Sequence, residues 1–314
     1  MKIIQAPRAS AILYNLLVSQ KTAKPWLLPA NICPIVPITF MKAKIPFEFV
    51  DISAQSLHMD LDQAETRMKK RDIGGLLYAH TYGEESTPVD FFTHAKSLNP
   101  EMLIVDDRCL CAPSSTATAS VDVVLFSTGY AKIVELESGG YALFRDEVIY
   151  QPVSLPFEPL HHAALEEQYK SSIQSRSPFA YRDSDWLMTD AELIEWKIYH
   201  RLIEVGLELS LIQRSTLNKV YSMRLPEEIQ LPPQYQTWRF SVRVKNQTQV
   251  IKAIFDAGLF ASTHYASLAG VMSEGRAPVA ESLAGEAVNL FNDHHFTAEM
   301  AGRICEIIVK TARW

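Results

Sequence analysis

The sequence has little glycine, few cysteines and no long apolar run. Its 314 residues include 12 glycines and 17 prolines, which excludes collagen-like and low-complexity chains. The longest apolar runs, such as residues 11–17, are too short to cross a bilayer, and the N-terminal residues lack the pattern of a secretory signal peptide. We therefore expect a soluble cytoplasmic protein that has no membrane partner.

Several common site motifs are also absent. None of the four cysteines (Cys33, Cys109, Cys111 and Cys305) forms a C-x-x-C pair, so zinc and thioredoxin-like sites have no support. The chain has no G-x-G-x-x-G fingerprint, Walker A stretch or H-E-x-x-H motif. The histidine pairs at 161–162 and 294–295 are adjacent, and we expect their side chains to diverge in surface or capping roles. We predict no metal site.

The charge balance and the apolar content limit the class of protein further. The chain has 30 basic and 36 acidic residues and a net charge of −6, which argues against a dedicated nucleic-acid binder. The hydrophobic fraction of 47% is ordinary for a globular protein with a full core. This length allows two or three domains, or one large α/β domain with a smaller companion.

Short apolar strands alternate with helical patterns through the first half of the chain. We predict strands at 26–28, 47–50, 75–78, 102–105, 121–126 and 141–144, and helices at 9–18, 32–42, 61–70 and 91–97. This alternation predicts a mostly parallel sheet that is covered by helices. Ligands of such sheets bind beyond the carboxyl ends of the strands, here at residues 29–31, 51, 80–83, 106–107 and 127–132.

The second half has a different pattern. Residues 151–182 are rich in proline, serine and charge and are typical of surface connections, and residues 188–221 have helical periodicity. We predict that this long helix bridges two domains, of residues 1–184 and 185–314. Strands at 238–244 and 259–262 and helices at 248–257 and 297–311 suit a small α+β domain.

The stretch from 104 to 144 carries the chemistry. One strand ends in two acids, the next ends in Ser127, Lys132 follows, and Gly139 and Gly140 open the next strand. A lysine there can hold the aldehyde of pyridoxal phosphate, an acid can pair with the pyridine nitrogen, and a serine can donate to the phosphate. Taken singly, each residue also has an ordinary structural explanation. Lys132 would be a solvated loop lysine, Ser127 a strand cap, and Asp106 and Asp107 turn acids.

The motifs in this order resemble the DegT/DnrJ/EryC1/StrS family of aminotransferases. IPFEFVDIS resembles a family strand, LLYAHTYG its H-x-Y-G loop, and IVDDRCLCA stands where the family has E-D-A-A-Q-A. FSTGYAK, ESGGYALF and the tail segments TWRFSVRV, STHYASL and VNLFNDHHFT also have counterparts. The resemblance implies a fold-type-I α/β large domain with a mostly parallel central sheet and a smaller C-terminal α+β domain. It also implies pyridoxal 5'-phosphate as cofactor, a homodimer, and transfer of an amino group from an amino acid to a carbonyl acceptor such as a nucleotide-linked keto sugar.

The resemblance assigns the site residue by residue. It places Lys132 on the cofactor aldehyde, Asp107 on the pyridine nitrogen and Ser127 on the phosphate. Because successive side chains of a strand face opposite sides, Asp106 is left to cap the strand or to bind a neighbour such as Arg108. Further positions toward the cofactor are Ala9, Ser10, Cys33 and Leu110, and candidates for substrate contact are His80, Tyr82, Arg239, His264 and Tyr265. For the last group, structural roles in turns and strands stay open, including a solvated Arg239.

Departures from the family pattern keep alternatives open. Arg8 and Ala9 replace glycine and threonine, Cys33 replaces a stacking aromatic residue, and Leu110 replaces glutamine or histidine. Asp185 and Leu187 replace an asparagine and an arginine, and the N-terminal arm of the family has no counterpart. A non-catalytic dimeric scaffold or regulator is therefore the alternative, although such a protein has no need of both Lys132 and Asp107. Another pyridoxal phosphate reaction, such as elimination, also stays open.

Overall fold

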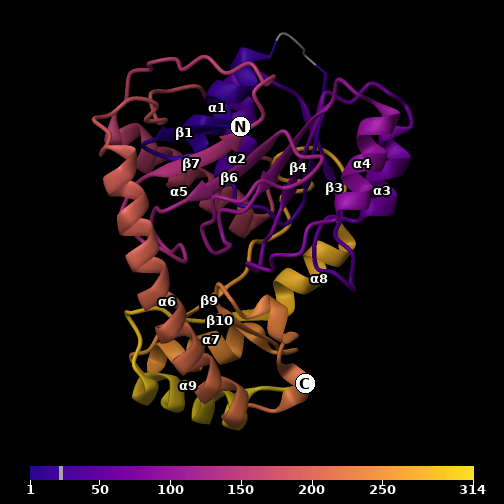
Figure 1. Ribbon diagram of the computed structural model, residues 1–314. Coiled ribbons are helices and arrows are strands. Elements are labelled where there is room, and N and C mark those ends of the chain that lie inside the picture. Colours follow the sequence, from indigo (N-terminus) through magenta and orange to yellow (C-terminus); the bar gives the residue numbers. More distant parts are fainter. Residues whose placement is uncertain (21–23) are drawn as a thin grey trace.

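The computed structural model describes residues 1–20 and 24–314 and contains a large and a small β-sheet (Figure 1). The large sheet has the strand order β1-β7-β6-β5-β4-β2-β3. Strands β2 to β6 run parallel to one another, and β7 runs antiparallel to both of its neighbours, β6 and β1. The bounds are β1 (Lys2–Ala6), β2 (Trp26–Pro29), β3 (Phe47–Val50), β4 (Gly75–Ala79), β5 (Leu103–Asp107), β6 (Val123–Ser127) and β7 (Gly140–Phe144). The predicted mostly parallel sheet is confirmed.

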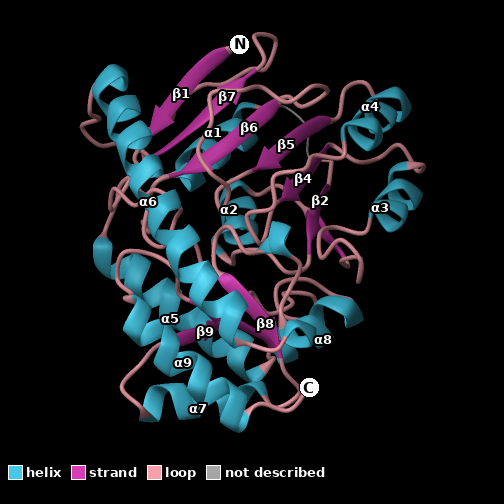
Figure 2. Cartoon of the chain, turned by 60° about the horizontal axis from the view of Figure 1, so that its bottom comes forward, coloured by secondary structure: helices cyan, strands magenta, loops and turns pink. Residues whose placement is uncertain are grey.

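Helices cover both faces of this sheet (Figure 2). One face packs against α1 (Ala9–Ser19), α2 (Ile35–Ala43) and α5 (Pro159–Ser175). The other face packs against α3 (Leu61–Met68), α4 (Val89–Leu98) and the beginning of α6 (Trp196–Arg224). Burial on both faces explains why the central strands are continuous apolar runs without alternation.

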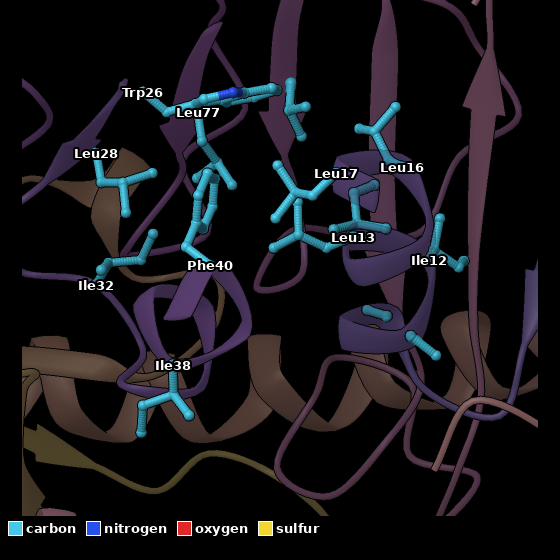
Figure 3. Packing of buried hydrophobic residues seen from close by; sticks show 14 of the residues in the cluster. Ile12, Leu13, Leu16, Leu17, Trp26, Leu28, Ile32, Ile38, Phe40 and Leu77 are labelled. Carbon is cyan, nitrogen blue, oxygen red and sulfur yellow. The ribbon is translucent and has the colours of Figure 1, made fainter. Parts of the chain in front are cut away.

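The core beneath α1 and α2 combines aliphatic side chains with aromatic ones, among them Trp26 and Phe40 (Figure 3). The rings of Trp26 and Phe40 meet edge to face with centroids 5.4 Å apart, and both side chains are fully buried. Ile12, Leu16 and Leu17 pack beside them from α1. This core fixes the start of α1 against the sheet, and the candidate site lies at that start.

The small sheet has the order β8-β10-β9 and is antiparallel. Its strands are β8 (Phe240–Arg243), β9 (Ala261–Thr263) and β10 (Ala287–Leu290), and its core includes side chains of α7 (Gln247–Asp256), α9 (Ala298–Thr311) and the second half of α6. Helix α8 (Pro278–Glu286) and two 3₁₀ turns, η1 (Glu227–Ile229) and η2 (Pro233–Tyr235), complete this part. Helix α6 runs from the large sheet to the small one (Figure 1). The boundary at residues 184 and 185 stays a prediction.

Three predictions about elements need correction. The stretch 151–182, predicted as surface connections, contains the 17-residue helix α5, which begins with Pro159 and is capped by the Glu158 side chain. The long helix starts at Trp196, not at 188. Helix α2 starts at Ile35, not at 32, since Pro34 lacks an N–H and disfavours helical geometry in the residue before it.

Strands β1 and β10 and helix α8 were not predicted at all. In the described part of the chain, no helix is long and apolar enough to cross a membrane. The cytoplasmic location stays a prediction.

Asp51, at the end of β3, joins the large sheet to the tail of the chain. Its buried carboxylate accepts from the backbone N–H groups of Val279 and Ala280 in the first turn of α8, each at 3.0 Å, and from Ile52 at 2.8 Å. A carboxylate at a helix N-terminus satisfies amides that the helix leaves unpaired. Asp51 is therefore a long-range helix cap.

We expect Asp51→Ala to lower the free energy of unfolding by about 1–3 kcal/mol, because it leaves buried amides without an acceptor. Urea unfolding measures the loss, and hydrogen exchange should show faster exchange at the start of α8. Asp60→Ala is the matched control, since Asp60 caps α3 within its own segment through Asp62 and Gln63. Unchanged exchange in α8 of Asp51→Ala would contradict the role.

Candidate active site

A cavity of about 440 Å³ opens where the parallel strands of the large sheet end. Lys132 and Asp107 both line it, and so do residues of α1, α2, α5 and the ends of β5 and β6. The lining residues named by the sequence motifs are Ala9, Ser10, Cys33, Asp107, Ser127 and Lys132. A larger hollow of about 650 Å³ lies between α6 and residues 227–240, but neither Lys132 nor Asp107 lines it. We therefore take the smaller cavity as the candidate site.

The two acids at the end of β5 have opposite surroundings. Asp106 is fully buried and accepts from His80 Nε2 at 2.7 Å and from Arg108 Nε at 2.8 Å. Burial alone would raise the pKa of Asp106, but the bonds and charges of His80 and Arg108 outweigh it and lower the pKa. The expected contact between Asp106 and Arg108 is thus present, and Asp106 is a carboxylate with its partners already in place.

Asp107 faces the cavity, and no cationic side chain of residues 1–20 and 24–314 is in ion-pair contact with it. Its Oδ1 accepts from the backbone N–H of Cys109 at 3.0 Å, and the Cys109 thiol also bonds to it. Burial raises the pKa of Asp107, and the Cys109 bonds and the charge of Lys132 offset only part of this. A buried carboxylate with a raised pKa, beside a lysine in a cavity, is the kind of group that a cationic ligand would stabilise.

The N-terminus of α1 also borders the cavity, which Ala9 and Ser10 line. The N-cap of α1 is Arg8, whose side chain makes no capping bond, so the helix start is open to an anion. The Ser127 side chain lines the same cavity. Gly140 permits this arrangement, because a Cβ there would lie 2.5 Å from the Ala9 nitrogen.

A smaller pocket of about 30 Å³ shares several of these residues. His80, Leu110 and Tyr265 line it together with Cys33, Asp107 and Lys132. The Tyr265 hydroxyl contacts the Cys33 thiol, and burial raises the pKa of that thiol. His80 closes the inner end, with Nδ1 2.5 Å from the Glu84 carbonyl oxygen in a turn where Gly83 has a φ of +76°. His80 therefore both holds this turn and lines the pocket.

Three predicted substrate residues lie outside both pockets in the described part of the chain. Tyr82 is fully buried and its ring stacks on His264 with centroids 4.0 Å apart. Burial, followed by the charge of His58, lowers the pKa of His264 to about 3, so this imidazole is neutral.

Arg239 is buried, pairs with Asp293 at 2.8 Å and lies 4.0 Å from the Phe291 ring centroid. The alternative of a solvated strand arginine is wrong, and the guanidinium already has a carboxylate partner.

The cavity is also lined by side chains that the sequence analysis did not assign to the site, among them Cys109, Tyr130, His162 and Glu166. His162 lies on α5, and its Nε2 is 3.3 Å from Arg8 Nη1. The histidine pair at 161–162 thus reaches the site, and the rings of His294 and His295 lie 3.9 Å apart rather than diverging. Nothing in the sequence around His162 signalled this, because the whole helix α5 was taken for a surface connection.

One group outside the cavity has the composition of a metal site. Ligand atoms of His58, His80 and Glu84 all lie within 4.8 Å of one another. Both ring nitrogens of His80 are already bonded, to Asp106 and to the Glu84 carbonyl. Only two ligands remain for an ion, so we assign no metal site to this group.

We expect opposite effects on stability when the two acids of β5 are neutralised in the cofactor-free protein. Asp106→Asn should lower stability near neutral pH by on the order of 3 kcal/mol, because it strips a buried ion pair of its carboxylate. Asp107→Asn should raise stability, because it removes a buried charge. Thermal unfolding followed by circular dichroism measures both.

The direction of each pKa shift determines how folding stability changes with pH. The folded-state pKa of Asp106 is lowered, so its contribution is present above the unfolded-state pKa and is lost as pH falls through the folded-state pKa. The folded-state pKa of Asp107 is raised, so wild type loses stability as pH rises through it, and the advantage of Asp107→Asn grows over that range. Equal losses in both variants would contradict the assignment of the two carboxylates.

The chain matches no protein-family model and no curated protein, but its fold matches solved structures. A DegT DnrJ EryC1 StrS aminotransferase from Brucella abortus is 14% identical with a TM-score of 0.71, covering 99% of this chain and 86% of that one. The sugar aminotransferase CalS13 from Micromonospora echinospora is 17% identical with a TM-score of 0.68, covering 98% and 87%. The Escherichia coli GDP-4-keto-6-deoxy-D-mannose-3-dehydratase with bound hydrated PLP is 12% identical with a TM-score of 0.65, also covering 98% and 87%. The chain therefore has the fold of these enzymes, as its motifs predicted.

Proposed function

We propose that the protein is a pyridoxal phosphate-dependent aminotransferase. The single observation that carries this is that Lys132 and Asp107 line one cavity together with the open N-terminus of α1. The residues present fit the cofactor. Lys132 suits its aldehyde, and Asp107, which forms no ion pair with another described residue, suits its ring nitrogen. Ser10, Ser127 and the amides at the start of α1 suit its phosphate. When bound, pyridoxal phosphate supplies an aldehyde that reacts with amines and a ring that withdraws electrons.

The chain's own groups then have separate tasks. Asp107 holds a proton at the ring nitrogen, and the raised pKa that burial gives this carboxylate returns toward its usual range once it has a cationic partner. Lys132 Nζ would hold the cofactor aldehyde, and as a free amine it would be the base that moves a proton between carbon atoms. Ser10, Ser127 and the first turn of α1 bind the phosphate.

We propose an amino acid as the donor and a nucleotide-linked keto sugar as the carbonyl acceptor. One fold neighbour is described as a sugar aminotransferase, which supports a sugar as the acceptor. A second candidate is elimination on a similar substrate, because another neighbour is a keto-sugar dehydratase with bound PLP. The scaffold alternative is weaker, since a scaffold has no need to bring a lysine and a buried acid to one cavity.

We propose that the working form is a homodimer. Five apolar residues of α6, each more than 40% exposed, recur at alternating spacings of four and three: Ile198, Leu202, Val205, Leu209 and Ile212. This spacing is the seam of a helix that packs against another helix. Figure 1 shows this part of α6 along one side of the molecule. A second copy of the chain would bury this stripe, which we call the α6 seam.

We expect borohydride reduction after incubation with pyridoxal phosphate to label Lys132. Lys132→Ala should abolish the label, because no other lysine of the described residues lines the cavity. Peptide mapping by mass spectrometry identifies the labelled residue. Lys42→Ala is the control, since Lys42 is bound to Asp183 and Ser184 and does not line the cavity. A label on another lysine, or none, would rule out the assignment.

We expect Leu209→Lys to shift the protein from dimer to monomer, because it places a charge in the α6 seam. Light scattering at micromolar concentration should give the mass of two chains for wild type and of one for the variant. Glu208→Lys places a lysine side chain one residue off the seam and should leave the dimer intact. A wild-type monomer would contradict the proposal.

A further inference from the structure

The segment that carries Lys132 has an unfavourable backbone. It connects β6 to β7 and spans residues 128–139, which we call the lysine loop. Ala131, immediately before the lysine, has a φ of 59°, in the left-handed region that residues with a side chain rarely adopt. Such a conformation persists only where surrounding contacts hold it in place.

Those contacts come from the C-terminal half of the chain. Trp238 Nε1 donates to the Ala131 carbonyl at 2.8 Å, and Arg214 Nη2 donates to the Lys132 carbonyl at 3.1 Å. Ser210 Oγ donates to the Ile133 carbonyl at 2.5 Å. Three consecutive carbonyls are thus bound by side chains of α6 and of the segment before β8. Because each bond fixes one peptide plane, together they fix the path of the chain through Lys132.

Arg214 links these contacts to one another. Its Nε donates to Ser210 Oγ at 3.0 Å, and its Nη1 donates to the Trp238 carbonyl and to Asn292 Oδ1, the latter at 2.6 Å. The planar guanidinium can do this because its donors form a rigid fork. Asn292 follows β10 and Trp238 precedes β8, so the same side chain ties the lysine loop to the small sheet.

The burial of this guanidinium is costly. Arg214 is 2% exposed, and within residues 1–20 and 24–314 no carboxylate comes within ion-pair distance of it. Burial, followed by the charge of Arg239, lowers the pKa of Arg214 to about 10, so the group still carries its charge at neutral pH. A charge held only by neutral acceptors contributes little to stability compared with an apolar side chain. We therefore expect the buried Arg214 guanidinium to have a role other than stabilising the fold.

Helix α6 also comes unusually close to the loop. A Cβ at Gly206 would lie 2.9 Å from Val134 Cγ1, so glycine lets the helix backbone pack directly on the residues after Lys132. Gly206, Ser210 and Arg214 are spaced four residues apart and face the loop from one side of α6. The contact is therefore a continuous face of the helix.

We propose that Arg214 is the positioning residue for Lys132: it holds the lysine loop in its left-handed turn so that Nζ faces the cofactor cavity. This inference rests on the proposed role of Lys132 and adds a residue more than 80 positions away in the sequence that no motif indicated. Arg214 does not touch the cofactor. It acts through the Lys132 carbonyl and couples the loop to the packing of the small sheet.

The test uses the full chain with Arg214→Met, Arg214→Lys and Tyr221→Phe. Tyr221 is the matched control, because it lies two turns further along α6, is fully buried and donates to the Phe291 carbonyl at 2.7 Å, away from the lysine loop. Hydrogen exchange of residues 128–139 in the cofactor-free protein is the first readout. The second is the rate at which pyridoxal phosphate is trapped on Lys132 by borohydride.

We expect Arg214→Met to speed exchange in the lysine loop and to slow trapping, each by at least tenfold, and Arg214→Lys to restore part of both. Tyr221→Phe should change neither, even where it lowers the melting temperature. If Arg214→Met does not fold, Ser210→Ala removes the Ile133 contact and should speed exchange in the same loop.

The inference is overturned if Arg214→Met or Ser210→Ala leaves loop exchange at the wild-type rate, or if Tyr221→Phe changes it equally. Failure of the proposed function is distinguishable, because wild type would then show no trapping on Lys132 whatever the exchange rates of the variants.

Discussion

The end of strand β5 is the constraint on which the candidate site depends. Two carboxylates follow each other in a strand that is buried on both faces, so one must point to each side of the sheet. His80 and Arg108 neutralise Asp106, and this fixes the strand end in place. Asp107 is thereby turned toward the cavity without a cation in contact. Asp106 thus has its partners within the fold, whereas Asp107 lines the cavity.

The other parts of the site are arranged around this strand end. Strand β6 pairs with β5 in parallel, which brings Ser127 and the residues after it to the same edge of the sheet. The core around Trp26 and Phe40 holds α1 against the sheet so that its N-terminal residues line the cavity. The C-terminal half of the chain contacts the first half at two further places. The first turn of α8 donates to the Asp51 carboxylate, and Arg214 donates to the Lys132 carbonyl in the lysine loop.

The sequence predicted the large sheet well and the elements around it poorly, and the roles of Lys132, Asp107 and Ser127 stay predictions, although all three line one cavity. Apolar runs such as Gly75–Ala79 can be recognised in the sequence, because a strand that is buried on both faces carries almost only apolar side chains. Lys132, Asp107 and Ser127 were found because they occur in a fixed order at strand ends. Helix α5 was missed because its composition resembles a surface connection, although it brings His162 to the cavity. The burial of Arg239 beside Asp293 and the reach of Arg214 depend on contacts between distant residues, which one sequence does not contain.

We expect the cavity lined by Asp107 and the start of α1 to hold pyridoxal phosphate bound through Lys132. We also expect the bound cofactor to accept an amino group from an amino donor. The absorption spectrum of the purified protein during titration with pyridoxal phosphate, followed by glutamate and other amino donors, tests this most directly. The account predicts a visible band that saturates at one equivalent per chain, is absent in Lys132→Ala, and shifts when an amino donor is added. No visible band at saturating cofactor would contradict it, and a band that no amino donor shifts would contradict amino transfer.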